Sequence, residues 1–188
     1  MRKTLLFLAV TALPASAMAA AGSYTVDPAH TFPHFEINHL GFSTMHGRFN
    51  ATEGKLTVDL AGKTGSVDVK IDANSIDTGF KKRDDHLRSP DFLNAAEYPT
   101  ITYKSSKVVI NGDSSATVDG TLTLMGVSKP VQLAVDHLQC GANPMNKKEM
   151  CGFNATATIK RSDFGVNYAL PAIGDEMKIT IEIEALKD

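Results

Sequence analysis

The feature that most restricts the fold of this chain is a strict alternation of apolar and polar residues. It is clearest in residues 67–73, 118–124, 153–160 and 177–186. Because successive side chains of a β-strand point to opposite faces, each segment predicts a strand with one buried and one solvated face. Shorter segments of the same kind bring the predicted total to about eight or nine antiparallel strands. The sequence contains no internal repeat, low-complexity tract or linker, so we expect a single all-β domain.

Residues 82–104 are the segment that breaks this pattern. Residues 84–87 predict a short helical turn. Ser89 and Pro90 predict the start of a second turn, because serine caps helix N-termini and proline fits the first helical position. A short helical insertion in an otherwise all-β chain favours a barrel that is closed at one end. A long crossover packed on the edge of a β-sandwich is the alternative.

The N-terminus predicts a cleaved export signal. Two basic residues at positions 2 and 3 precede an uncharged run over 4–13, and small residues fill 15–21. This is the order of a basic region, an apolar core and an A-x-A cleavage site. The apolar run is too short to span a bilayer. We therefore expect a soluble, exported protein, and the bacterial type of signal indicates the periplasm.

We place cleavage after Ala19, with Ala21 as the alternative. Residues 1–19 are then the signal peptide, and residues 20–188 form the mature domain. Cleavage removes two bases and no acid, so the formal net charge changes from −2 to −4. A mildly acidic chain argues against nucleic acid as a partner.

An exported chain of alternating strands could also be an outer-membrane barrel. Such barrels carry a lipid-facing apolar band between girdles of aromatic residues. Here Trp is absent, only four residues are Tyr, and the outward faces of the predicted strands carry Lys, Glu and Asp. The sequence therefore predicts a barrel that does not span a membrane.

The chain has two cysteines, Cys140 and Cys151, on either side of a ten-residue loop. Export would place them in an oxidising compartment. We predict a structural disulfide that closes a short hairpin-like loop. The alternative, a reactive redox pair, would favour a closer spacing such as C-x-x-C.

Four histidines close together in sequence, His30, His34, His39 and His46, have the residue type of a metal site. In a strand each residue advances about 3.3 Å, so His30 and His34 would lie roughly 13 Å apart. His34 and His39 would point to opposite faces. We therefore predict no metal site, and we expect His39, on the apolar face, to be a hydrogen-bonded core residue.

Asp84, Asp85 and His86 have the residue types of acid–base catalysis. The sequence offers no nucleophile at a strand-to-helix turn beside them, and no Gly-rich phosphate loop or dinucleotide motif. Carboxylates at a helix start commonly complement the positive end of the helix dipole. We predict no catalytic residue.

Small residues occupy inward positions of several predicted strands: Ala73, Gly120, Ala155 and Ala157. An eight-stranded barrel is just wide enough to fill itself with side chains or to hold one small ligand. Small inward residues favour a dry ligand cavity. Large residues on facing strands, such as Phe35 and Phe153, could fill the same space instead.

Four segments, residues 27–49, 76–103, 120–133 and 161–166, resemble the YceI-like family. The resemblance covers essentially the whole mature chain. It implies a lipocalin-like antiparallel eight-stranded barrel whose hydrophobic tunnel binds a polyisoprenoid tail, in a protein that often forms a homodimer. The ligand would be a prenyl pyrophosphate or a ubiquinone-type quinone, and no cofactor is required. The cysteine pair and its loop are not part of the family pattern.

With this implication, the inward apolar residues become candidates for lining the tail: Phe35, Ile37, Val69, Ile71, Leu122, Leu124, Ala155, Ala157 and Ile181. Arg83, His86 and Arg88, near the helical insertion, are candidates for an anionic head group. The leading hypothesis is a periplasmic carrier or store for an isoprenoid lipid. The alternatives are an enzyme that acts on such a lipid and a secreted interaction protein that uses the barrel as a scaffold.

Overall fold

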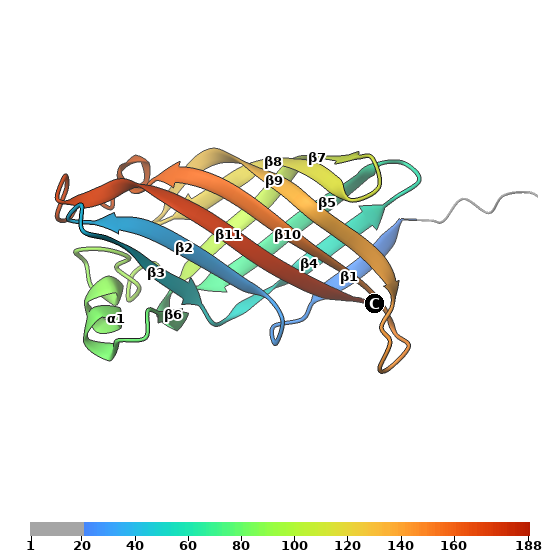
Figure 1. Cartoon of the computed structure of the whole chain (residues 1–188), viewed down its shortest axis with the longest axis horizontal. Coiled ribbons are helices and arrows are strands. Elements are labelled where there is room, and N and C mark those ends of the chain that lie inside the picture. The colour runs from blue at the N-terminus through green and yellow to red at the C-terminus, as the bar shows by residue number, and fades with distance from the viewer. Residues whose placement is uncertain (1–20) are drawn as a thin grey trace, which may run out of the picture.

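The computed structural model describes residues 21–188 as a single antiparallel sheet with one α-helix (Figure 1). The predicted signal peptide and its cleavage site after Ala19 lie outside these residues and stay predictions. In chain order the elements are β1 (Gly22–Val26), β2 (Phe32–His39), β3 (Ser43–Phe49), β4 (Thr52–Asp59), β5 (Thr64–Asp72), η1 (Ala73–Ser75), β6 (Ile76–Asp77), α1 (Lys81–Arg88), β7 (Thr100–Asn111), β8 (Ser115–Leu124), β9 (Val127–Ala142), β10 (Glu149–Lys160), η2 (Arg161–Phe164) and β11 (Ile173–Lys187).

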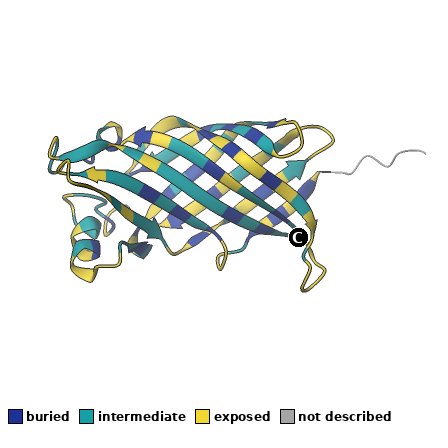
Figure 2. Cartoon of the chain, viewed as in Figure 1, coloured by how far each residue is buried: buried dark blue, intermediate teal, exposed yellow. Residues whose placement is uncertain are grey.

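The sheet closes into a barrel. The strands β1, β4, β5, β7, β8, β9, β10 and β11 are hydrogen-bonded in that order, and β1 also pairs with β11. The prediction of an eight-stranded antiparallel barrel with a short helical insertion is therefore confirmed, and the sandwich alternative is wrong. Buried and exposed residues alternate along its strands (Figure 2).

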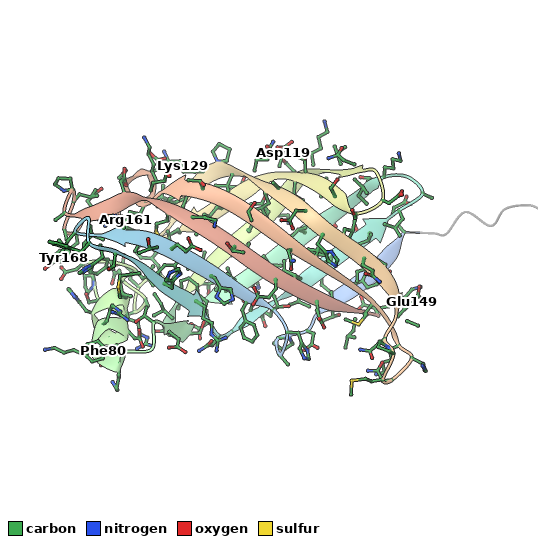
Figure 3. The ribbon with its side chains drawn as sticks, viewed as in Figure 1. Phe80, Asp119, Lys129, Glu149, Arg161 and Tyr168 are labelled. Atoms are coloured by element: carbon green, nitrogen blue, oxygen red, sulfur yellow. A yellow bond between two sulfur atoms is a disulfide. The ribbon has the colours of Figure 1, made fainter. Side chains whose placement is uncertain are left out.

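The last strand, β11, pairs with two different strands on the side away from β10. Its C-terminal residues pair with β1, whereas residues 173–182 pair with β2. From β2 the sheet continues through β3 to β6. Figure 3 shows Phe80, Arg161 and Tyr168 at one end of the molecule and Glu149 at the other. We call the end with α1 and residues 161–172 the helical end, and the opposite end the disulfide end.

The helical insertion differs from its prediction. The helix begins at Lys81, before the predicted turn, and ends at Arg88. Ser89 follows it in an extended conformation, with φ −72° and ψ 170°. The residue before a proline is driven out of the helical region, so Ser89 ends α1. The predicted second turn follows it, because the Ser89 hydroxyl accepts a hydrogen bond from the backbone N–H of Asp91 at 3.4 Å and the Ser89 carbonyl accepts one from that of Phe92. Among residues 21–188, no helix is long and apolar enough to cross a bilayer.

The predicted disulfide between Cys140 and Cys151 is confirmed. The two residues face each other in neighbouring strands, β9 and β10, with their Cα atoms 4.1 Å apart. Cys151 is fully buried in the packed core of the disulfide end. The bond therefore ties two long strands together beside their connecting loop.

Replacing both Cys140 and Cys151 by alanine should lower the free energy of unfolding by roughly 3 kcal/mol, because an open loop gains conformational entropy in the unfolded chain. Urea unfolding of the oxidised protein and of the double variant measures the difference. A reducing agent should shift the midpoint of the parent protein and leave that of the double variant in place. Equal midpoints for the two oxidised proteins would contradict a stabilising role.

Candidate ligand-binding cavity

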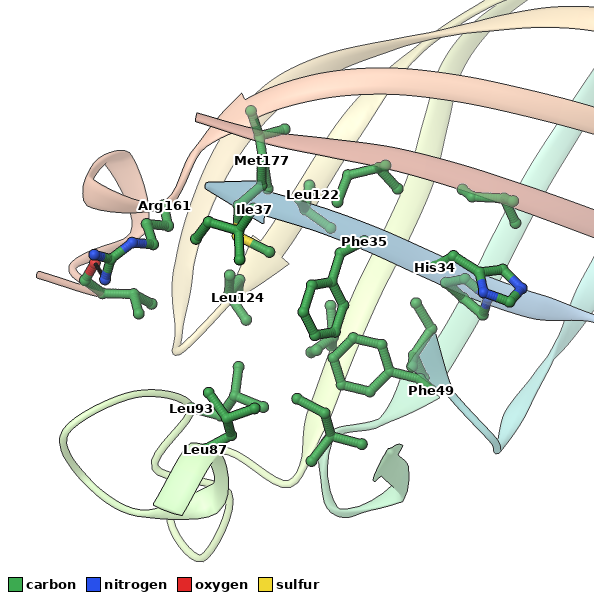
Figure 4. Close-up of a pocket in the computed structure, with 18 of the residues that line it drawn as sticks. His34, Phe35, Ile37, Phe49, Leu87, Leu93, Leu122, Leu124, Arg161 and Met177 are labelled. Carbon is green, nitrogen blue, oxygen red and sulfur yellow. Dashed lines mark hydrogen bonds between the residues drawn. The ribbon is translucent and has the colours of Figure 1, made fainter. Parts of the chain in front are cut away.

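The barrel holds a cavity of about 460 Å³ toward its helical end. Its wall consists almost entirely of aliphatic and aromatic side chains that project from the inner faces of the strands (Figure 4). A space of this size and chemistry favours a ligand with a large apolar part, because apolar groups gain free energy when they leave water.

The cavity lies beside a gap in strand pairing, next to β6. β5 pairs with both β4 and β7, whereas β6 pairs only with β3 among the described strands. The segment that connects β6 to β7 covers this opening, and it contributes Leu87, Phe92 and Leu93 to the wall. Figure 4 shows Leu87 and Leu93 reaching toward the cavity from below the strands. The helical insertion thus forms part of the cavity wall.

Most of the residues predicted to line a tail lie on this wall. They are Phe35, Ile37, Val69, Ile71, Leu122, Leu124, Ala157 and Ile181. Ala155 shares the inward face of β10 with Ala157, but it is 1% exposed within the packed core, outside the cavity wall. Its strand partner Ile181 does border the cavity, so the hollow reaches this level of the barrel and packed neighbours cover Ala155 itself. Contact of the other eight with a ligand stays a prediction.

The small inward residues do not create the cavity in the way predicted. Of the four, only Ala157 lies on the wall; Ala73 and Ala155 are 1% exposed among packed neighbours. At Gly120 a Cβ atom would lie 2.5 Å from Cζ of Tyr103. The tyrosine ring therefore fills the space that the glycine leaves. The filling residue at Gly120 comes from the neighbouring strand β7, whereas the alternative that the sequence left open was filling by large residues on facing strands.

Tyr103 forms part of the wall on the side of the packed core. Its hydroxyl lies 3.0 Å from the carbonyl oxygen of Val118 and 2.9 Å from that of Val131. Burial raises the pKa of Tyr103 to about 12, and the negative charge of Asp119 acts in the same direction. The phenol is consequently neutral at any physiological pH and serves as a hydrogen-bond donor.

Three aromatic rings bridge the helical end. His86 of α1, Phe92 from the following loop and Tyr168 from the η2–β11 connection contact one another edge to face, with centroid distances of 5.0, 5.3 and 5.2 Å. His86 Nε2 also lies 3.0 Å from Oδ2 of Asp91. All three rings border the cavity. They connect the helical insertion to the opposite loop across the end of the barrel.

Arg161 organises that opposite loop. It is 2% exposed, and its guanidinium donates hydrogen bonds to four backbone carbonyl groups. The acceptors are Gly174 (2.8 Å), Val166 (2.9 Å), Tyr168 (2.9 Å) and Ile173 (3.1 Å). Burial lowers the pKa of Arg161, and the charge of Asp175 partly offsets this effect. The side chain thereby fastens the loop that carries Tyr168.

The sequence contained a signal for Arg161 that the prediction missed. The inward positions of β10 are 153, 155, 157 and 159, and the next position of the same parity is 161. A charged residue in register with a buried face must find internal partners, because an unpaired buried charge is costly. Which carbonyls would serve as partners was not readable from the sequence.

Two of the predicted head-group residues, Arg83 and His86, border the cavity. Arg83 donates from Nε to the hydroxyl of Thr78 and from Nη2 to its carbonyl, both at 2.7 Å. Among residues 21–188, Arg83 forms no ion pair with a carboxylate. Its position is fixed by these bonds, and the Asp84 carboxylate lies nearby, because it accepts a hydrogen bond from the same Thr78 hydroxyl.

Arg88 lies elsewhere. Its guanidinium donates to the carbonyl groups of Asn74 and Ile76, each at 2.8 Å, and pairs with Asp85 at 3.1 Å. These contacts fasten α1 to β6, and Arg88 is not on the cavity wall. The distinction follows from helix geometry, since residues 83 and 88 lie on different sides of a helix with 3.6 residues per turn.

The ionisable side chains on the described cavity wall include no carboxylate. Arginine, histidine and tyrosine are present, and no aspartate or glutamate is among the described wall residues. The inward bases are Arg83, Arg161, His39 and His86. His34 and His46 also border the wall, but they have the outward parity of their strands, and His34 pairs with Glu182. This composition disfavours a cationic ligand and is compatible with an anionic or hydrogen-bond-accepting head group.

The four histidines have separate roles. His30 Nδ1 lies 2.9 Å from Asp27, a contact that raises the pKa of His30, and 3.9 Å from Glu184. These three form the single group within residues 21–188 whose geometry could hold a metal ion.

His34 pairs with Glu182 at 2.8 Å. His39 is half-buried on the cavity wall and has no hydrogen bond to any described side chain, so its predicted role as a hydrogen-bonded core residue is wrong.

A model of the YceI-like domain matches residues 24–185 of this chain. The chain belongs to the YceI-like family. Among curated YceI-like relatives, a UPF0312 protein of Pseudomonas paraeruginosa is 40% identical over 191 residues, covering 100% of this chain and 99% of the relative. A UPF0312 protein of Vibrio cholerae is 35% identical and covers 97% and 98%.

Several solved structures share the fold of this chain. BcnA of Burkholderia cenocepacia matches with a TM-score of 0.75 and 27% identity, covering 85% of this chain and 98% of BcnA. The YceI protein of Campylobacter jejuni matches with 0.69 and 30%, covering 81% and 90%. A polyisoprenoid binding domain from Saccharophagus degradans matches with 0.63 and 20%, covering 88% and 98%, a likeness that shows the fold alone.

Proposed function

We propose that this protein binds a lipid with a long polyisoprenoid tail inside its barrel and stores or transports it in the periplasm. The observation that carries the proposal is the cavity of about 460 Å³, with its aliphatic wall and without a described carboxylate. The name of the Saccharophagus degradans neighbour, a polyisoprenoid binding domain, agrees with this choice of ligand.

The free energy of burial is sufficient for such a ligand. Each CH₂ group that leaves water contributes about 0.8 kcal/mol. A few isoprene units therefore exceed the roughly 4–15 kcal/mol that association costs in lost freedom of motion. A branched, flexible tail needs a dry space of suitable shape, and the wall offers this through residues such as Ile71, Leu122 and Ile179.

The head group would lie beside the helical insertion. Arg83 is held at the cavity wall by two hydrogen bonds to Thr78 and makes no direct ion pair among the described residues, and His86 borders the same cavity. A pyrophosphate would accept charge-assisted hydrogen bonds from both side chains, and a quinone carbonyl would accept weaker ones. We therefore propose a prenyl pyrophosphate or a ubiquinone-type quinone as the ligand, held near Arg83.

The geometry favours binding over catalysis. Asp84 is buried and accepts hydrogen bonds from the backbone and hydroxyl of Thr78. Asp85 pairs with Lys81 at 2.7 Å. Neither carboxylate is on the described cavity wall, so neither is placed to act with His86 on a bound lipid. The alternative of a secreted interaction protein that uses the barrel only as a scaffold predicts a filled interior, and the cavity of about 460 Å³ argues against it. Export and homodimer formation rest on the signal-like N-terminus and on the family resemblance.

The test is to identify what the protein holds. The protein purified from the periplasm is extracted with organic solvent, and mass spectrometry should reveal a prenyl-tailed compound in near-stoichiometric amount. The Ala157→Trp variant, purified in parallel, serves as the matched control and should release little. Protein that is repeatedly empty and also fails to bind added prenyl pyrophosphates or prenyl quinones would overturn the proposal.

A further inference from the structure

The interior of the barrel is hollow on one side of Tyr103 and packed with side chains on the other. This residue borders the cavity and also belongs to the packed core of the disulfide end. Beyond it lies a second void of only about 40 Å³, lined by residues that include Leu56, Val108 and Phe153. Val67 borders both spaces. The two voids are therefore adjacent, and packed side chains at this level keep them apart.

The Tyr103 ring is fixed in its position. It projects from β7, and its hydroxyl reaches backbone carbonyls of both β8, at Val118, and β9, at Val131. The ring lies against Gly120, where any side chain would collide with it. Turning the ring away would break the hydrogen bond that the single hydroxyl proton makes with these carbonyls and open an empty space over Gly120, and both changes cost free energy.

We propose that Tyr103 is the floor of the cavity and determines the longest isoprenoid tail that the barrel accepts. This inference rests on the proposed function and specifies its ligand. A tail that enters beside Arg83 extends along the barrel until it meets the ring, and additional isoprene units find no apolar space beyond it.

The size of the cavity gives an estimate of that length. Along β11 the wall runs from Ile173 to Ile183. At about 3.3 Å per residue and a strand tilt of about 40°, this span is roughly 25 Å along the barrel axis. An isoprene unit adds four chain bonds of about 1.5 Å, or about 5 Å when zigzag geometry is allowed for. The cavity therefore accommodates about five units.

Removing the ring should lengthen the cavity. In Tyr103→Ala the space of the phenol group would join the main cavity to the void of about 40 Å³. The disulfide end would still be closed by Leu56, Phe153 and the Cys140–Cys151 bond. We expect room for one or two further isoprene units.

The experiment measures the affinity of delipidated protein for prenyl pyrophosphates of three to ten units by titration calorimetry. For the parent protein, affinity should rise with each unit up to about five and then level off or fall. Tyr103→Ala should move this break by one or two units and bind the longer tails at least tenfold more tightly than the parent. Tyr103→Phe, which keeps the ring, should leave the break unchanged.

The outcomes separate the two proposals. If the parent protein binds no member of the series, the proposed function fails. If it binds with a clear break that is the same in Tyr103→Ala, the lipid function stands and the role of Tyr103 as the floor is wrong. Circular dichroism verifies the fold of each variant, and Tyr103→Leu, which also lacks the ring and leaves a smaller space, replaces Tyr103→Ala if the alanine variant does not fold.

Discussion

Replacement of Ala157 by tryptophan is expected to weaken the binding of a prenyl tail by roughly 100-fold. Ala157 lies on the cavity wall, in register with Ile179 of β11. An indole group at this position would project into the hollow and take the place of several buried CH₂ groups of the tail. The loss of three or four such groups, at about 0.8 kcal/mol each, corresponds to about two orders of magnitude in affinity.

The Ala157→Trp variant should still fold, because its new side chain enters empty space instead of packed core, where insertion would cost about 1–3 kcal/mol. The matched control is Thr158→Trp, the next residue of β10, whose side chain is exposed on the outer face of the barrel. Its affinity should equal that of the parent protein. If both variants bind prenyl pyrophosphates as the parent does, the tail does not occupy this cavity.

Replacement of Arg161 by methionine is expected to lower the free energy of unfolding by roughly 3–5 kcal/mol. Methionine keeps much of the length of the side chain and removes four hydrogen bonds to backbone carbonyls. Charged donors of this kind contribute about 1.5–3 kcal/mol each, and the carbonyls left behind in a buried site add a penalty. Recovery of the cost of burying the guanidinium reduces the total.

Urea unfolding measures this change, and hydrogen exchange localises it. Amides of residues 166–174 should exchange faster in Arg161→Met, whereas those of the disulfide end should keep their relative protection. Lys160→Met, which removes an exposed charge at the neighbouring position, should change stability by less than about 0.5 kcal/mol. Equal stability of Arg161→Met and the parent protein would show that the loop does not depend on this side chain.

The prediction of the cavity wall succeeded where it depended on the parity of residues along a strand. Phe35 and Ile37 in β2, and Leu122 and Leu124 in β8, were assigned inward from the alternation of their neighbours, and all four border the cavity. Parity is a local property of extended backbone, so a single segment is enough to read it. The same parity was right for Ala155 as an inward position, but it carries no information on which inward side chains are covered by packed neighbours.

The errors arose where partners come from distant parts of the chain. Gly120 was taken as a source of empty space, but Tyr103 of the neighbouring strand covers it. Arg88 was placed near a head group, but carbonyls of residues 74 and 76 hold it at the edge of β6.

The amino-acid sequence by itself determined that this chain forms alternating antiparallel strands, which faces turn inward, and that Cys140 and Cys151 form a disulfide, whereas the closed barrel was implied by the family resemblance. These properties follow from side-chain periodicity and from spacing, which act over a few residues. The tertiary structure alone decided that the barrel is hollow at the helical end and packed below Tyr103, and that Arg161 holds the loop beside it. Packing is decided by the register between strands that are far apart in sequence, and no single segment contains that register.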